Sequence, residues 1–180
     1  MAPVLSALDD HADVVRSVLC STGQHREMLD QVFELLGLHP DHDLDIMQPN
    51  QTLPALTARL FAKLTPVVEM ERPDWILAQG DTTTVFVAAM TAYYHRVRFG
   101  HVEAGLRTGD PYNPFPEEIN RRIAGVLATY HFAPTETARQ ALLGEGVSGD
   151  CIWVTGNTKR DAIQVTVRRP MPPLARHLLQ

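Results

Sequence analysis

The stretch from residue 75 to residue 103, WILAQGDTTTVFVAAMTAYYHRVRFGHVE, decides the fold of this chain. Its first five residues, Trp75–Gln79, form a short apolar run typical of a buried strand, and residues 82–94 have the length of a helix. A second apolar run follows at residues 97–103. Because the turns between these segments are so short, the stretch predicts a strand, a helix and a second strand that are connected directly.

The same alternation extends along the chain on both sides. On the N-terminal side, the pattern predicts a strand over 14–21, a helix over 24–36 and a helix over 53–71 that bends near Pro66. On the C-terminal side, helices and strands are expected to alternate over 117–128, 130–133, 135–143, 151–154 and 157–167. Strands that alternate with helices in this way indicate an α/β fold with a doubly wound, mostly parallel sheet.

Composition is that of an ordinary globular protein and excludes several classes. The chain has 180 residues, of which 44% are hydrophobic and 21% charged, so general disorder is excluded. We expect one domain over residues 1–167 and a loose, proline-containing tail over 168–180. Apolar runs are too short for a membrane helix and the first residues lack a secretory signal, so a cytoplasmic protein without membrane contact is expected.

Charge, cysteines and motifs narrow the chemistry further. A net charge of −5 does not favour nucleic-acid binding, although the pair Arg121–Arg122 could contact a smaller anion. Cys20 and Cys151 lack the spacing of a metal site, and the His/Asp cluster at 39–43 lacks it too, so no metal is expected. The sequences of phosphate loops, nucleophile elbows and dinucleotide-binding turns are absent.

Two carboxylates follow predicted strands directly. Ligands of open α/β sheets bind outside the carboxyl ends of the strands, and Asp81 and Glu103 stand at two such ends. For Asp81 the alternative is an N-cap of the next helix, because Asp is among the best capping residues. For Glu103 the alternative is an ion pair with Arg107 at the mouth of the loop.

A third acidic group opens the helix after Pro116. Glu117 and Glu118 lie in its first turn, where negative charge interacts favourably with the helix dipole. Arg121 and Arg122 follow four residues later and could pair with them along the helix. From the residues alone, the chain is an α/β domain with an acid-lined ligand cleft.

Five motifs, in this order, closely resemble the non-hydrolysing bacterial UDP-N-acetylglucosamine 2-epimerases. They are TGQHREMLD at 22–30, QGDTTT at 79–84, HVEAGLRTGD at 101–110, PEEINR at 116–121 and TGNT at 155–158. The resemblance covers nearly the whole chain and implies a Rossmann-like domain that is the N-terminal half of a GT-B-type two-domain fold. Nucleotide-sugar is then bound between the two domains, and the intact protein is expected to be a homodimer.

This resemblance also implies a reaction and a set of site residues. The family interconverts UDP-GlcNAc and UDP-ManNAc by eliminating UDP and adding it back, which requires no cofactor. Asp81, Glu103 and Glu117 match the family's acidic catalytic residues, and His101 and Arg107 match substrate-binding positions. Which acid is the base stays open.

A second, regulatory UDP-GlcNAc site is implied for Gln24 and His25 by the same resemblance. Family members begin with a strand and a Gly-Thr-Arg-Pro-Glu loop, whereas Met1-Ala2-Pro3 resembles the stretch after that loop. We therefore expect an incomplete half of an epimerase. The alternatives are a noncatalytic fragment that binds nucleotide-sugar or dimerises and, in third place, a GT-B glycosyltransferase domain.

Overall fold

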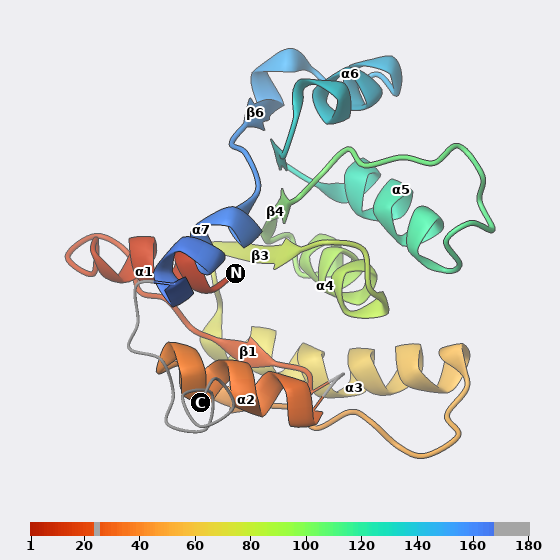
Figure 1. Ribbon diagram of the computed structural model, residues 1–180. Coiled ribbons are helices and arrows are strands. Elements are labelled where there is room, and N and C mark those ends of the chain that lie inside the picture. Colours follow the sequence, from red (N-terminus) through yellow and green to blue (C-terminus); the bar gives the residue numbers. More distant parts are fainter. Residues whose placement is uncertain (24–25, 168–180) are drawn as a thin grey trace, which may run out of the picture.

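A computed structural model describes residues 1–23 and 26–167 and shows the expected α/β fold (Figure 1). Its larger sheet has four parallel strands in the order β3-β4-β5-β6. These strands are Trp75–Gln79, Arg98–Val102, Tyr130–Ala133 and Ile152–Val154. The helices that connect them are α4 (Thr83–Tyr94), α5 (Glu117–Leu127) and α6 (Glu136–Gly144). The strand–helix–strand prediction for residues 75–103 is confirmed.

A second, two-stranded parallel sheet forms from β1 (Cys20–Ser21) and β2 (His42–Asp43), with α2 (Arg26–Leu36) between them in the chain. The prediction of a strand over 14–21 is wrong for most of its length. Val14 and Val15 are 77% and 38% exposed and pair with no strand among the described residues. Residues with strand propensity form a strand only where a partner lies beside them.

Helix α3 (Leu53–Glu71) coincides with the predicted helix and continues across Pro66. Thr52 caps its start, since the side chain accepts a hydrogen bond from the Ala55 amide at 3.3 Å. Its buried face repeats every four residues, at Leu56, Leu60, Leu64 and Val68. The helix therefore presents one apolar stripe, and it packs this stripe against α4 and the adjoining core.

Helix α4 is buried between α3 and α5. Small and β-branched residues at its core positions let the neighbouring helices approach closely: Val85, Val87, Ala88, Ala89 and Ala92. Phe99 of β4 is 1% exposed and completes this main cluster. A smaller cluster beneath α6 is built from Ala104, Ala133, Ala138, Leu142 and Ile152.

Two helices at the ends of the described chain lie side by side. Helix α1 (Ala2–Asp9) was not predicted, and it contacts α7 (Thr158–Val167) (Figure 1). The expected tail at 168–180 lies outside the described residues. Within residues 1–23 and 26–167, no helix is both long and apolar enough to cross a membrane.

Gly105 makes a close contact that its lack of a side chain permits. A Cβ there would lie 2.3 Å from the Ala138 carbonyl oxygen, and the φ angle is +85°. We expect Gly105→Ala to lower the free energy of unfolding by about 3 kcal/mol, from backbone strain together with this overlap. Urea denaturation measures it. The matched change Gly144→Ala, at an exposed helical position with open space, should raise stability by about 0.5–1 kcal/mol; equal effects of the two changes would contradict the packing described.

Candidate functional site

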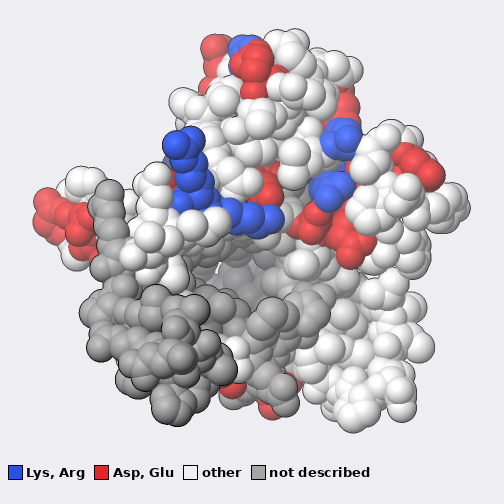
Figure 2. Space-filling model, viewed as in Figure 1, with Lys and Arg blue, Asp and Glu red and all other residues white. Residues whose placement is uncertain are grey.

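The carboxyl ends of β3 and β4 bring two of the predicted acids to one edge of the sheet. Gln79 of β3 is in register with Val102 of β4, so the residues that follow them, Gly80–Asp81 and Glu103, emerge at the same level. Glu117 begins α5, the helix after β4. Figure 2 shows acidic and basic side chains gathered on the face between α7 and α5.

Asp81 is held by α5 and does not cap α4. Arg121 donates from Nε and Nη2 to the Asp81 Oδ2 atom, at 2.9 and 2.5 Å. Asn120 donates from Nδ2 to the Asp81 carbonyl oxygen at 2.9 Å. Thr82 is the N-cap residue of α4, so the capping interpretation of Asp81 is wrong. The carboxylate turns toward α5 because a buried guanidinium offers it two donors.

Glu103 has a left-handed backbone, with φ at +65°, and its side chain is 13% exposed. Gln79 donates from Nε2 to Oε2 at 3.0 Å, and Lys159 Nζ lies 3.4 Å from Oε1. The alternative partner, Arg107, points elsewhere, because its Nε and Nη2 atoms bind Glu145 at 2.7 and 2.8 Å. The alternative of a Glu103–Arg107 ion pair is therefore wrong.

Glu117 differs from the other two acids. Its side chain is half-buried in the first turn of α5 and makes no hydrogen bond or ion pair with any described residue. The pairing expected along the helix is made by its neighbour instead, since Glu118 binds Arg122 at 3.0 Å and Arg121 at 3.4 Å. Glu117 is thus the one acid of the three whose carboxylate is left without a described partner.

Glu118 is fully buried and ties the β4–α5 loop to the helix. Its Oε2 atom accepts a hydrogen bond from the Thr108 amide at 3.1 Å, and its Oε1 atom accepts one from Arg122 Nε at 3.1 Å. Burial by itself raises the pKa of this carboxyl, but the bonds from Thr108, Arg122 and the Gly109 amide outweigh burial, so the pKa is lowered. Glu118 is a structural carboxylate.

His101 lies beneath the site rather than in it. The side chain is 1% exposed, and Nε2 donates to the Gly80 carbonyl oxygen at 2.7 Å. Burial lowers the pKa of His101, and it lowers the pKa of its neighbour His131 to about 4. Both imidazoles are therefore neutral near pH 7. His101 acts on a ligand indirectly, by holding the Gly80–Asp81 turn in place.

The structure thus brings together Asp81, Glu103 and the first turn of α5, and it places Arg107 against α6. Gln24 and His25 lie outside the described residues. The contacts also identify residues that were not singled out for the site: Gln79, Asn120 and Lys159. Gln79 and Asn120 stand beside the acids within the quoted motifs, so adjacency in sequence was the available signal.

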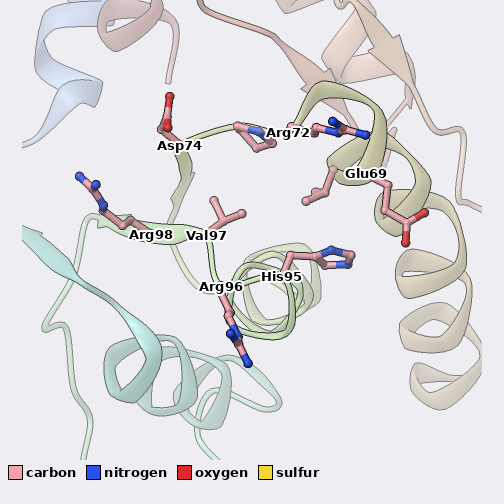
Figure 3. A pocket seen from close by; sticks show the side chains of 9 residues that line it. Glu69, Arg72, Asp74, His95, Arg96, Val97 and Arg98 are labelled. Carbon is pink, nitrogen blue, oxygen red and sulfur yellow. The ribbon is translucent and has the colours of Figure 1, made fainter.

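Two hollows lie elsewhere on the described surface. One, of about 560 Å³, lies past the carboxyl ends of β5 and β6 and is lined by Asn157 and Arg160 among others. The other lies at the opposite end of the sheet (Figure 3). There Arg96 and Arg98 point in different directions, and Arg98 stacks over the Trp75 ring at 5.3 Å. These cations do not converge on one ligand.

In the part of the chain that the structure describes, no three His, Cys, Asp or Glu side chains lie close enough together to hold a metal ion. Cys20 and Cys151 are free thiols. Burial, with the nearby Asp43 carboxylate, raises the pKa of Cys20 to about 11. This thiol is therefore protonated near neutral pH.

Comparison with known proteins points to a single family. The sequence model of the UDP-N-acetylglucosamine 2-epimerase family matches residues 6–177. A Yersinia pestis protein named UDP-N-acetylglucosamine 2-epimerase is 55% identical over 163 residues, which are 91% of this chain and 43% of that protein. The chain therefore spans less than half the length of the curated relatives that it matches.

Solved structures that resemble this chain come from the same family. The UDP-GlcNAc 2-epimerase of Neisseria meningitidis bound to UDP-GlcNAc is 48% identical with a TM-score of 0.89, over 93% of this chain and 45% of that one. A UDP-N-acetylglucosamine 2-epimerase structure from Listeria monocytogenes, described as putative, is 46% identical with a TM-score of 0.91, over 99% of this chain and 47% of that one. The fold class is confirmed.

The buried Glu118 carboxylate makes stability depend on pH. Because its pKa in the folded state lies below the ordinary 4.5, its contribution is present above pH 4.5 and is lost as the pH falls through the folded value. We expect Glu118→Gln to cost about 1–3 kcal/mol at pH 7 and to flatten the loss of stability below pH 4.5. Urea denaturation across pH measures both. Glu69→Gln, at an exposed position of α3, is the control; an equally small change in both variants would contradict this role.

Proposed function

The chain belongs to the UDP-N-acetylglucosamine 2-epimerase family, and on that premise we propose that it supplies the acidic half of a site that interconverts UDP-GlcNAc and UDP-ManNAc. One observation carries the proposal. Three carboxylates, Asp81, Glu103 and Glu117, stand at the carboxyl ends of adjacent parallel strands and at the start of the next helix, where α/β sheets bind ligands.

The reaction explains the need for several acids. Carbon C2 of the sugar lies beside no carbonyl, so its proton is not removed by simple enolisation. Departure of UDP from C1, with loss of the C2 proton, gives 2-acetamidoglucal, and UDP then adds back after a proton arrives from the opposite face. Such a route needs a proton acceptor and a proton donor within hydrogen-bond reach of C2, and carboxyl groups serve for both.

The three acids differ in a way that suits different tasks. Asp81 is fixed by Arg121 and Glu103 by Gln79 and Lys159, whereas Glu117 has no described partner. A carboxylate that no described side chain holds can turn toward the C2 proton of a bound ligand. We therefore assign the mobile proton to Glu117, with Asp81 and Glu103 as the oriented acids beside it.

The departing diphosphate needs cations, and three of the arginines described at this edge are already engaged. Arg107 binds Glu145, Arg121 binds Asp81 and Arg122 binds Glu118. Lys159 is more available, since its side chain is 71% exposed and lies 3.4 Å from Glu103. Arg160 is exposed too, but it lines a hollow that includes none of the three acids, so Lys159 beside them is a weak clamp for two phosphates. This supports the alternative in which the chain alone binds nucleotide-sugar without converting it.

Because few cations are available for the diphosphate, we expect no conversion of UDP-GlcNAc by the 180-residue chain alone. In a chimera, this chain replaces the matching 163 residues of the Yersinia pestis relative. That chimera should form UDP-ManNAc in D₂O with deuterium at C2, which NMR or mass spectrometry detects. Robust turnover by the chain alone would contradict the first expectation, and an inactive, folded chimera would contradict the proposed function.

Within the chimera, Asp81→Asn, Glu103→Gln and Glu117→Gln should each lower kcat by about 10²–10⁴-fold, because each removes one acid or base. Glu69→Gln, an exposed carboxylate at the other end of the sheet, serves as the control and should leave kcat unchanged. Steady-state kinetics with thermal melts separates lost chemistry from lost folding. Acid variants that keep the parent kcat would exclude these residues from the reaction.

We also propose that the chain associates as a homodimer through the ends of α3 and α4. Met70, Tyr93 and Tyr94 are 63–64% exposed there, and the two tyrosine rings are neighbours with centroids 6.2 Å apart, so they form an apolar patch. Sedimentation velocity should show a dimer, and Tyr93→Glu should shift it to monomer, whereas Val126→Glu on α5 should not. A parent chain that is monomeric at about 0.1 mM, a concentration at which weak dimers form, would contradict this assignment.

A further inference from the structure

We infer that Arg121 is a positioning residue that sets the orientation of the Asp81 carboxylate. The role of that orientation in a reaction rests on the proposed function, whereas the contact between the two side chains does not. Two nitrogens of Arg121, Nε and Nη2, bind the same oxygen of Asp81, at 2.9 and 2.5 Å. Charge-assisted bonds of this length fix a side chain more firmly than neutral ones do. Asp81 Oδ1 makes no hydrogen bond with any described residue, so it is the oxygen left for a ligand.

Arg121 is itself fixed from the other side. Its Nη1 atom lies 3.4 Å from Oε2 of Glu118, the fully buried carboxylate that also binds Thr108 and Arg122. The Arg121 side chain is only 14% exposed. All three nitrogens of the guanidinium are thus engaged by protein carboxylates, which argues against Arg121 as the anion contact suggested by the sequence pair Arg121–Arg122.

The backbone beside Asp81 is held as tightly. Asn120 donates to the Asp81 carbonyl and His101 donates to the Gly80 carbonyl, at 2.9 and 2.7 Å. The Gly80 amide in turn donates to the Val102 carbonyl at 3.0 Å. With the turn fixed by these bonds, the remaining freedom of Asp81 is the rotation of its side chain, and Arg121 removes that freedom.

Helix α5 links this arrangement to a second acid. Glu117 and Arg121 are four residues apart, so they lie on the same face of the helix, one turn from each other. The Arg121–Asp81 pair therefore joins the turn that carries Asp81 to the helix that carries Glu117. Lysine cannot reproduce the link, because it offers a single nitrogen in place of the planar fork.

NMR spectroscopy of the 180-residue chain tests the inference without any need for activity. The three-bond Hα–Hβ couplings of Asp81 report its side-chain rotamer, and the Arg121 Nε–H resonance reports the pair. In the parent chain we expect one Asp81 rotamer and an Nε–H that exchanges slowly with solvent. In Arg121→Lys the couplings should average over rotamers, and in Asp81→Asn the Nε–H exchange should accelerate at least 10-fold, an order-of-magnitude figure for a lost charge-assisted bond.

Arg139→Lys is the matched control, because Arg139 also pairs with a glutamate on its own helix, at 3.1 Å, and lies on α6. It should leave the Asp81 couplings unchanged. Amide spectra verify the fold of each variant, and Asp81→Asn replaces the test if Arg121→Lys fails to fold. A single Asp81 rotamer without Arg121, or an Nε–H that does not respond to Asp81→Asn, would overturn the inference. Loss of the proposed epimerase activity would leave these readouts unaffected, so the two failures are distinguishable.

Adding UDP separates positioning from direct ligand contact. If Arg121 positions Asp81, its Nε–H resonance should stay in place when UDP is titrated to 10 mM, roughly the range where weak single contacts saturate. A large shift of that resonance with UDP concentration would show that the guanidinium leaves Asp81 for the phosphate, and it would overturn the assignment.

Discussion

A guanidinium held between two carboxylates is the interaction on which this site depends. Arg121 joins Asp81, which follows β3, to Glu118, which is buried at the start of α5 and binds the loop after β4. Two segments that are distant in sequence, the turn after β3 and helix α5, therefore meet at this cation, and Glu118 ties the loop after β4 to the same helix. Removing one partner of such a buried group leaves the others unpaired, which is why it costs more than an exposed ion pair does.

Local patterns in the sequence were sufficient for much of the fold. The strand Trp75–Gln79 and the helix Leu53–Glu71 appear where they were predicted, because a short apolar run, a capping Thr52 and a four-residue repeat act over neighbouring residues. The strand expected over 14–21 forms only at Cys20–Ser21, because pairing requires a partner that lies elsewhere in the chain. Helix α1 was not predicted, although Val4, Leu5 and Leu8 are spaced as on one face of a helix.

The site was predictable in its acids but not in their partners. Asp81 and Glu103 were identified because they follow strands, and that much needs only the sequence order of elements. Arg107 was expected near Glu103 and in fact binds Glu145, while Asp81 binds Arg121 and does not cap α4. These ion pairs join side chains about 40 residues apart in the chain, so the spacing of residues in the sequence does not reveal which partners meet.

We propose that nucleotide-sugar binds at the carboxyl ends of β3 and β4 and not at the hollow on the opposite end of the sheet. The most direct test is to map amide chemical shifts of the chain during titration with UDP-GlcNAc. We expect the largest changes at Gly80, Glu103 and Glu117. Changes centred on Arg72, Arg96 and Arg98, with none at the three acids, would contradict it.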